Sequence, residues 1–279
     1  MALAKVKSLI HGYSSPKPFS IAEIQRCIDY DIQVVDDWLC KLKTYADGEE
    51  NLQGKNVLEL GPGSDIGIGL YLLAKGCFQY NACDVHNLMK TTPDSFYRQF
   101  FGRLSRTEPQ KKIDFLRQQL AAFKAGYPSR LNSLVRDDFD LVAAFGPSTV
   151  DLVFSQAAFE HFDDVPTTIS QLHTVCKPGA ILVAQVDLKT HSRWIRQRDP
   201  NNIYRYPQAL YRLLRFRGIP NRIRPFQYKA ALEAAGWQDI SIYPTSVLSE
   251  GEGYPGMDKR FSDKKNQMDY LSIMLCARK

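Results

Sequence analysis

Residues 56–67 read NVLELGPGSDIG. The segment VLEL at 57–60 has the composition of a short buried strand, and a glycine-rich turn follows it directly. Glu59 places a carboxylate inside that strand, immediately before a loop with few side chains. Gly61 and Gly63 let the backbone approach a ligand closely because no Cβ intervenes. The stretch therefore predicts a strand, a ligand-binding loop and a helix in succession.

The rest of the chain alternates strand-like and helix-like segments. Helical patterning is clear after Ser20, which has capping-box spacing to Glu23, and between 94 and 126 with a break near 107–109. Helices are also expected after the glycine loop, through AAFEHF, in TISQLHTVCKPG and from Pro225 onward. Residues 136–145 are ambiguous between strand and turn. Further strands are expected at 78–84, 150–155, 180–188, 239–244 and 270–277.

This alternation predicts an α/β fold with a doubly wound, mostly parallel seven-stranded sheet and helices on both faces. No linker divides the chain, so we expect a single domain over 1–279. Its parts are an N-terminal helical extension (1–54), a core (55–188), a basic insert between the fifth and the last strands (189–225), and a C-terminal helix with a strand pair (226–279).

Composition excludes several classes of protein. The 279 residues contain no apolar run near the roughly 18–20 residues that a membrane span requires. Six cysteines are scattered without any CxxC pair, which argues against a zinc site or a disulfide framework. We expect a cytoplasmic protein without a bound metal.

Positive charge is concentrated in one segment. Residues 189–229 contain eleven Lys and Arg against one acid, a local net charge of +10, whereas the whole chain carries +6. Aromatic residues alternate with arginines here, a composition that suits phosphates and flat rings. Leu210, Leu213 and Leu214 also favour a helix packed through its leucines.

The glycine loop distinguishes two kinds of ligand. A dinucleotide fingerprint needs a third glycine, but Ile66 stands at that position and Gly67 follows one residue late. Glu59 would repel phosphates. A cationic ligand explains the acid better, and S-adenosylmethionine presents an ammonium and a sulfonium group.

Four motifs in order carry a family resemblance: VLELGPG, the acid in ACDVH, VDLVFSQAAFEHF and the strand KPGAILV. Together they resemble the class I S-adenosylmethionine-dependent methyltransferases over about residues 55–188, and in particular their members that act on small molecules and glycans.

The resemblance implies roles for the residues that match its motifs. Glu59, Gly61 and Gly63 would face the methionine part of S-adenosylmethionine, and Asp84 would accept both ribose hydroxyl protons. The adenine contact falls to an acid among Asp137, Asp138 and Asp140, of which Asp138 with Phe139 is favoured. Ser155 and Gln156 would line the place where cofactor and acceptor meet.

Two histidines are candidate bases for methyl transfer to a hydroxyl, His161 in FEHFDD and His191 in DLKTHSRW. The segment after the predicted fourth strand lacks the [ND]PP[YF] motif of enzymes that methylate exocyclic amines. We therefore expect O-methylation of a small-molecule, natural-product, glycan or lipid-linked acceptor.

The basic segment leaves the acceptor open. Arg222 and Arg224 in NRIR are the candidate anion-binding residues, and they would suit an acidic or phosphorylated acceptor. RNA would suit the segment too, so an RNA-binding methyltransferase is the alternative. An NAD-dependent oxidoreductase is a third interpretation, which the glycine pattern and Glu59 disfavour.

Overall fold

A seven-stranded sheet runs through the computed structural model, with the strands in the spatial order β3-β2-β1-β4-β5-β7-β6. The structure describes residues 5–6, 9–10, 21–48, 51–89, 92–192, 194–216, 218–249 and 256–279. Ser20, and with it the expected capping box, lies outside them. The strands are β1 (Asn56–Leu60), β2 (Gln79–Asp84), β3 (Leu131–Val135), β4 (Val150–Gln156), β5 (Cys176–Asp187), β6 (Gln238–Val247) and β7 (Tyr270–Arg278).

Helices connect most of these strands. They are α2 (Ile24–Tyr45), α3 (Gly67–Ala74), α4 (Asp94–Leu104), α5 (Gln110–Lys124), α6 (Leu141–Phe145), α7 (Val165–Val175), α8 (Gln208–Leu214) and α9 (Pro225–Ala234). Short 3₁₀ turns are η1 (Ile21–Glu23), η3 (Phe159–His161), η4 (Asn202–Arg205), η5 (Lys259–Phe261) and η6 (Lys264–Asn266). Within the described ranges, no helix combines the length and the apolarity needed to cross a membrane.

The strand pairing confirms the predicted α/β architecture. β1 is parallel to both β2 and β4, and β2 is parallel to β3. β6 and β7 form an antiparallel pair. Strand order reverses between β1 and β4, so the loops that follow these two strands lie at a topological switch point. Ligands of open α/β sheets bind at that place, beyond the carboxyl ends of the strands.

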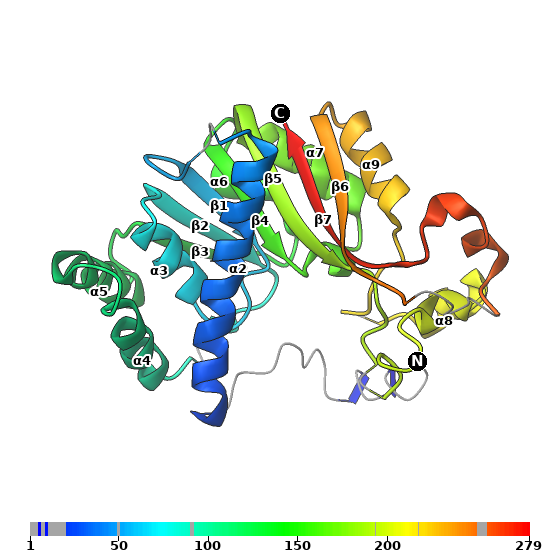
Figure 1. Cartoon of the computed structure of the whole chain (residues 1–279), viewed down its shortest axis with the longest axis horizontal. Coiled ribbons are helices and arrows are strands. Elements are labelled where there is room, and N and C mark those ends of the chain that lie inside the picture. The colour runs from blue at the N-terminus through cyan, green and yellow to red at the C-terminus, as the bar shows by residue number, and fades with distance from the viewer. Residues whose placement is uncertain are drawn as a thin grey trace. The chain divides into compact units, whose positions relative to one another are not determined.

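By its contacts the chain forms two compact units. The glycine-loop unit comprises Pro16–Gln156, Gln171–Val183 and Lys279, and the insert unit comprises Met1–Ser15, Ala157–Ser170 and Ala184–Arg278. In the glycine-loop unit, α2 packs against α3 and α4 (Figure 1). The Trp38 ring on α2 stacks on Phe154 of β4 with 4.9 Å between centroids, which fixes α2 on the sheet.

Three expected elements differ in the structure. The segment through AAFEHF is only the turn η3, because Ala157 takes a left-handed φ of 51° and Phe162 is extended. The helix in TISQLHTVCKPG ends at Val175, and β5 begins at Cys176. β3 precedes the ambiguous stretch 136–145, and only the first of its five residues is buried, so its strand pattern is weak. The predicted break between 94 and 126 is confirmed by α4 and α5.

Candidate functional site

The loop after β1 has the backbone geometry that its glycines predict. Gly61 and Gly63 have φ values of 73° and 79°, in the left-handed region that favours glycine. The Gly61 amide donates to the Cys83 carbonyl at 3.0 Å, which ties the loop to the end of β2. A Cβ at Gly63 would meet no atom within 4 Å, so the loop backbone is open to a ligand there.

Glu59 of β1 lies immediately beneath this loop. Its side chain is 1% exposed, and the Tyr80 hydroxyl donates to its Oε2 at 2.5 Å, while Oε1 has no hydrogen-bond partner. Burial raises the pKa of Glu59 to about 8, although the hydrogen bond from Tyr80 works in the opposite direction. The carboxyl group is thus held protonated near neutral pH unless a cation approaches it.

Two further buried acids accompany Glu59, and the sequence did not single them out. Asp65 of the loop accepts the Gly67 amide at 2.7 Å, and burial raises its pKa to about 6. Asp31 of α2 is also buried, and its Oδ2 has no hydrogen-bond partner. Burial and the neighbouring Asp65 raise the pKa of Asp31 well above its ordinary value. We call Asp31, Glu59 and Asp65 the acid group.

Gly67 makes this arrangement possible. A Cβ at that position would lie 2.1 Å from Asp31 Oδ2 and 2.9 Å from Asp65 Oδ1. Gly67 therefore leaves room for two carboxyl groups at the start of α3. Asp31 stands on the apolar stripe of α2, between the buried Ile28 and Val34. A carboxylate among the apolar positions of a predicted helix is the sequence signal that could have identified Asp31.

Asp84 lies at the end of β2, as predicted. Its Oδ1 accepts the His86 amide at 2.9 Å, and the side chain is half-buried. Burial raises its pKa, partly offset by that amide and by the charge of His86.

The three acids considered for adenine differ in their surroundings. Arg136 donates to both Asp138 oxygens, at 2.9 and 2.7 Å, and this hydrogen-bonded ion pair lowers the pKa of the exposed Asp138 to about 2. Asp140 caps α6 by accepting the Ala143 amide at 2.9 Å. Asp137 is exposed. The adenine contact of Asp138 and Phe139, which has a φ of 50°, stays a prediction.

Ser155 and Gln156 end β4, at the same sheet edge as the glycine loop. Ser155 is fully buried, and its hydroxyl donates to the Leu60 carbonyl at 3.0 Å. It thereby joins the ends of β4 and β1. Gln156 is half-buried.

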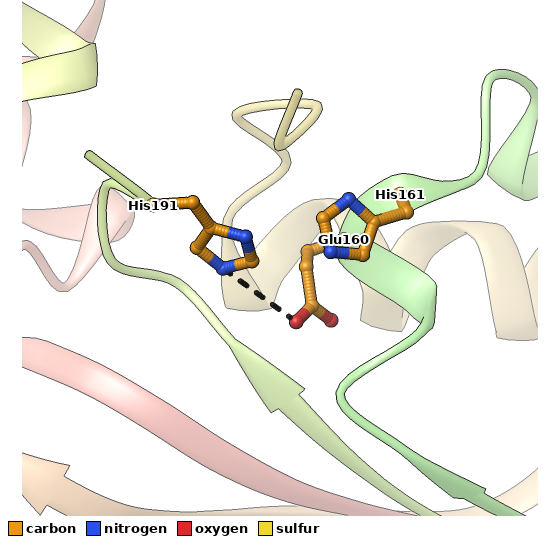
Figure 2. A group of neighbouring side chains, drawn as sticks. All are labelled: Glu160, His161 and His191. Atoms are coloured by element: carbon orange, nitrogen blue, oxygen red, sulfur yellow. Dashed lines mark ion pairs between the residues drawn. The ribbon is translucent and has the colours of Figure 1, made fainter. Parts of the chain in front are cut away.

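In the insert unit, both predicted histidines meet at one carboxylate, that of Glu160 (Figure 2). The His161 and His191 rings lie 4.8 Å apart between centroids. His191 Nε2 is 3.9 Å from Glu160 Oε1 and 3.5 Å from Asp187 Oδ2. We call Glu160, His161 and His191 the histidine group; the sequence predicted its histidines and missed Glu160.

Burial dominates the electrostatics of this group. It raises the pKa of Glu160, which is 2% exposed, to about 8, and nearby backbone amides offset only part of this effect. Burial and the charge of His191 lower the pKa of His161 to about 4. Burial alone would raise the pKa of Asp187, but its contacts with His191, the Lys189 amide and cationic neighbours hold it below its ordinary value.

Asn221 from the basic segment holds this turn in place. Its side-chain amide donates to the carbonyls of Phe159 and Phe162 at 2.8 and 3.1 Å, and its backbone amide donates to the Glu160 carbonyl at 2.7 Å. The insert thus positions the backbone that carries Glu160 and His161.

Arg222 and Arg224, the predicted anion-binding residues, lie in the interior of the insert unit, and their role in anion binding stays a prediction. Arg224 is fully buried and donates to the carbonyls of Asn266, Gln267 and Tyr270 at 2.9, 2.5 and 3.0 Å. Arg222 donates to the Tyr206 carbonyl at 2.6 Å and packs over the Tyr211 ring. These guanidinium groups hold loops of the insert together.

Other cations of the basic segment also have partners within the unit. Arg196 pairs with Asp187, Arg205 with Asp199 and Arg215 with Asp163. Arg193 and Arg217 lie outside the described residues. The alternative of a helix packed through Leu210, Leu213 and Leu214 holds only for the half-buried Leu214. Leu210 and Leu213 are exposed, and Tyr211 is the buried residue of α8.

Comparison with known proteins gives a consistent result. Residues 33–242 match the family model described as a methyltransferase domain. No curated protein matches the sequence. Many solved structures match the fold, at low sequence identity.

Three of these structures illustrate the likeness. A phosphoethanolamine N-methyltransferase 2 from Haemonchus contortus, in complex with phosphomonomethylethanolamine and S-adenosylhomocysteine, has a TM-score of 0.51 and 15% identity over 95% of this chain and 59% of that one. The same enzyme with S-adenosyl-L-methionine gives 0.50 and 14% over 100% and 57%. An S-adenosylmethionine-dependent methyltransferase from Mesorhizobium loti gives 0.46 and 14% over 85% and 96%. At these identities the likeness concerns the fold.

Proposed function

The chain belongs to the methyltransferase domain family and uses S-adenosylmethionine, and from this premise we propose that it methylates a hydroxyl group of a small-molecule or glycan-like acceptor. The observation that carries the proposal on the cofactor side is the acid group beside an open glycine loop. Glu59 Oε1 and Asp31 Oδ2 are buried without hydrogen-bond partners. Unpaired buried carboxyl oxygens are costly, and a cationic ligand relieves that cost.

The residues of the glycine-loop unit fit S-adenosylmethionine in a defined way. We assign the acid group to the positively charged methionine end of the cofactor. The open backbone at Gly63 would let the cofactor approach the loop closely. Asp84 is assigned to the ribose hydroxyls, since a carboxylate can accept from both of them. Asp138 with Phe139 is assigned to adenine, and Ser155 with Gln156 to the edge of the site.

Bound S-adenosylmethionine supplies an activated methyl group, so the protein must align the acceptor and remove its proton. As the acceptor oxygen forms its bond to the methyl carbon, the carbon–sulfur bond breaks and its electron pair stays on sulfur. The hydroxyl proton leaves to a base. We propose that this proton is taken up at the histidine group, where His161 and His191 are the candidate bases.

Of the two, His191 has the better surroundings for a free base. Its Nε2 lies 3.5 Å from Asp187 Oδ2 and 3.9 Å from Glu160 Oε1, so neighbouring carboxyl groups can orient the ring. His161 is more deeply buried, and its lowered pKa of about 4 makes it a weak proton acceptor at neutral pH.

Substitution tests the histidine assignment. His191→Ala should lower turnover by roughly 100-fold or more, the usual contribution of general base catalysis. Its affinity for S-adenosylmethionine should stay unchanged, as measured by calorimetry. Full activity in both His191→Ala and His161→Ala would show that neither histidine is the base. Alignment of the acceptor would then be the protein's contribution to the reaction.

Labelling identifies the acceptor class. The purified protein is incubated with methyl-labelled S-adenosylmethionine and an extract of source cells that lack the gene, and the extract is then fractionated. Label that survives nuclease and is found as a methyl ether in small metabolites, glycans or lipids supports the proposal. Nuclease-sensitive label would replace it with RNA methylation, and label on nitrogen or carbon would refute O-methylation.

A further inference from the structure

We propose that Glu160, His161 and His191 bind a divalent transition-metal ion of the zinc or iron class (Figure 2). Each side chain offers one ligand atom, and these atoms lie within 4.8 Å of one another. In a tetrahedral site with bonds of about 2.0–2.1 Å, neighbouring ligand atoms are about 3.3 Å apart. His191 Nε2 and Glu160 Oε1, 3.9 Å apart, are near that separation.

The second observation is independent of these distances. Four atoms of the group are buried without any hydrogen-bond partner, namely both Glu160 carboxyl oxygens, His161 Nδ1 and His191 Nε2. The large majority of buried side-chain polar atoms in native proteins are hydrogen-bonded. Four such atoms in three neighbouring side chains are therefore an unusual concentration, and one cation bound among them would give a partner to one atom of each side chain.

The surrounding groups satisfy the histidine group only in part, because Asp187 Oδ2 lies 3.5 Å from His191 Nε2. Asp187 is the nearest other acid to His191, but Arg196 donates to Asp187 Oδ2 and the Lys189 amide donates to its Oδ1 at 3.1 Å. Arg196 is thus committed to Asp187 and leaves the Glu160 carboxyl group unpaired.

The donor set indicates the class of metal. Two imidazole nitrogens and one carboxylate suit zinc, iron and neighbouring first-row ions, whereas calcium and magnesium prefer oxygen ligands alone. Three protein ligands also leave coordination positions for another molecule, which is the arrangement of catalytic rather than structural zinc sites. The backbone that carries Glu160 and His161 is clamped by Asn221, so two of the ligands are fixed in place.

The consequence for the reaction rests on the proposed function. With the ion bound, His191 Nε2 would be a ligand and not a base. The ion would then lower the pKa of an acceptor hydroxyl bound to it, and the hydroxyl proton would pass to solvent water. The site itself is independent of that chemistry, because binding can be measured without any acceptor.

The test uses the tag-free protein after treatment with a chelator, titrated with Co²⁺ and followed by its visible absorption. We expect one Co²⁺ per chain. Glu160→Gln and His191→Asn should each weaken binding by at least about 100-fold, the upper end of what the loss of a supporting partner costs. His173→Ala is the matched control, since it removes a histidine outside the group and should bind like the wild type.

Two further readouts keep the outcome clear. Zn²⁺ should raise the Tm of the wild type but not of the two ligand variants, because an ion that binds the folded state stabilises it. Absence of stoichiometric Co²⁺ binding, or equal binding by wild type and variants, would overturn the metal site. Calorimetry with S-adenosylmethionine on the metal-free protein separates the two proposals: normal cofactor binding without Co²⁺ binding refutes only the metal site.

Discussion

Glu59→Gln isolates the buried carboxyl group under the glycine loop. Glutamine has nearly the same shape as glutamate, and its side-chain oxygen can still accept a hydrogen bond from the Tyr80 hydroxyl. In the wild type this hydroxyl donates to Glu59 Oε2 at 2.5 Å. It cannot ionise. In the folded wild type the pKa of Glu59 is raised from 4.5 to about 8 by burial. The folded state therefore binds more protons than the unfolded state between these two pH values.

The sign of the effect follows from this difference. The stability contributed by Glu59 is fully present below pH 4.5 and is lost as the pH rises to about 8. One pH unit in this window corresponds to about 1.4 kcal/mol, and the whole window to a change of about 5 kcal/mol. Glu59→Gln lacks this loss, so its free energy of unfolding should rise relative to the wild type as the pH increases.

Urea unfolding at pH 5, 6.5 and 8 measures the difference. Asp31 and Asp65 titrate in both proteins, so the difference between the two curves contains the share of Glu59 together with its coupling to these two acids. We expect the variant to gain about 2–4 kcal/mol on the wild type between pH 5 and 8. Parallel curves would show that Glu59 does not carry a raised pKa, and the account of the acid group would fail.

Three further substitutions test other parts of the structure. Asp84→Ala should weaken S-adenosylmethionine binding by roughly 100-fold, the loss of two hydrogen bonds to a charged acceptor; calorimetry showing wild-type affinity would exclude the ribose assignment. Gly67→Ala should lower the free energy of unfolding by about 2 kcal/mol, because the added Cβ would overlap Asp31. Gly126→Ala is a control for backbone strain alone, since Gly126 has a φ of 74° and open space around it. Arg224→Met should cost about 3 kcal/mol in urea unfolding by leaving buried carbonyls without donors; unchanged stability combined with weaker acceptor binding would restore Arg224 as a ligand-binding residue.

The sequence predicted the parts of the fold that depend on local pattern. Glu59, Gly61 and Gly63 stand in one short segment, and their spacing alone indicates a strand, a turn and a ligand loop. The end of β2 at Asp84 follows in the same way. β3 was not recognised as a separate strand, because a strand at the sheet's edge is mostly half-buried and its hydrophobic pattern is weak.

The missing site residues depend on contacts that are distant in sequence. Asp31 and Asp65 are 34 positions apart in the numbering and meet only because α2 packs beside α3. Glu160 and His191 meet in the same non-local way. No local pattern predicts such pairs.

The surroundings of Arg222 and Arg224 could not be predicted from the sequence for a related reason. Arg222 and Arg224 are the predicted anion-binding residues, and the structure places both in the interior of the insert unit. Its small core gathers around Tyr204, Tyr211 and Phe261, and the two guanidinium groups pack on these rings and satisfy loop carbonyls. The burial of these arginines depends on carbonyl groups that are distant in the sequence, so it can be predicted only when the positions of those carbonyl groups are known.

Proton release on cofactor binding tests the central claim most directly. S-adenosylmethionine is titrated calorimetrically at pH 6.5 in buffers of different ionisation enthalpy, where its own amino group stays protonated. The account predicts that the cation ionises the acid group, so about one proton leaves per cofactor bound, and fewer leave in Glu59→Gln. Binding without proton release, or identical release by both proteins, would contradict the assignment of the buried acids to the positive charge of S-adenosylmethionine.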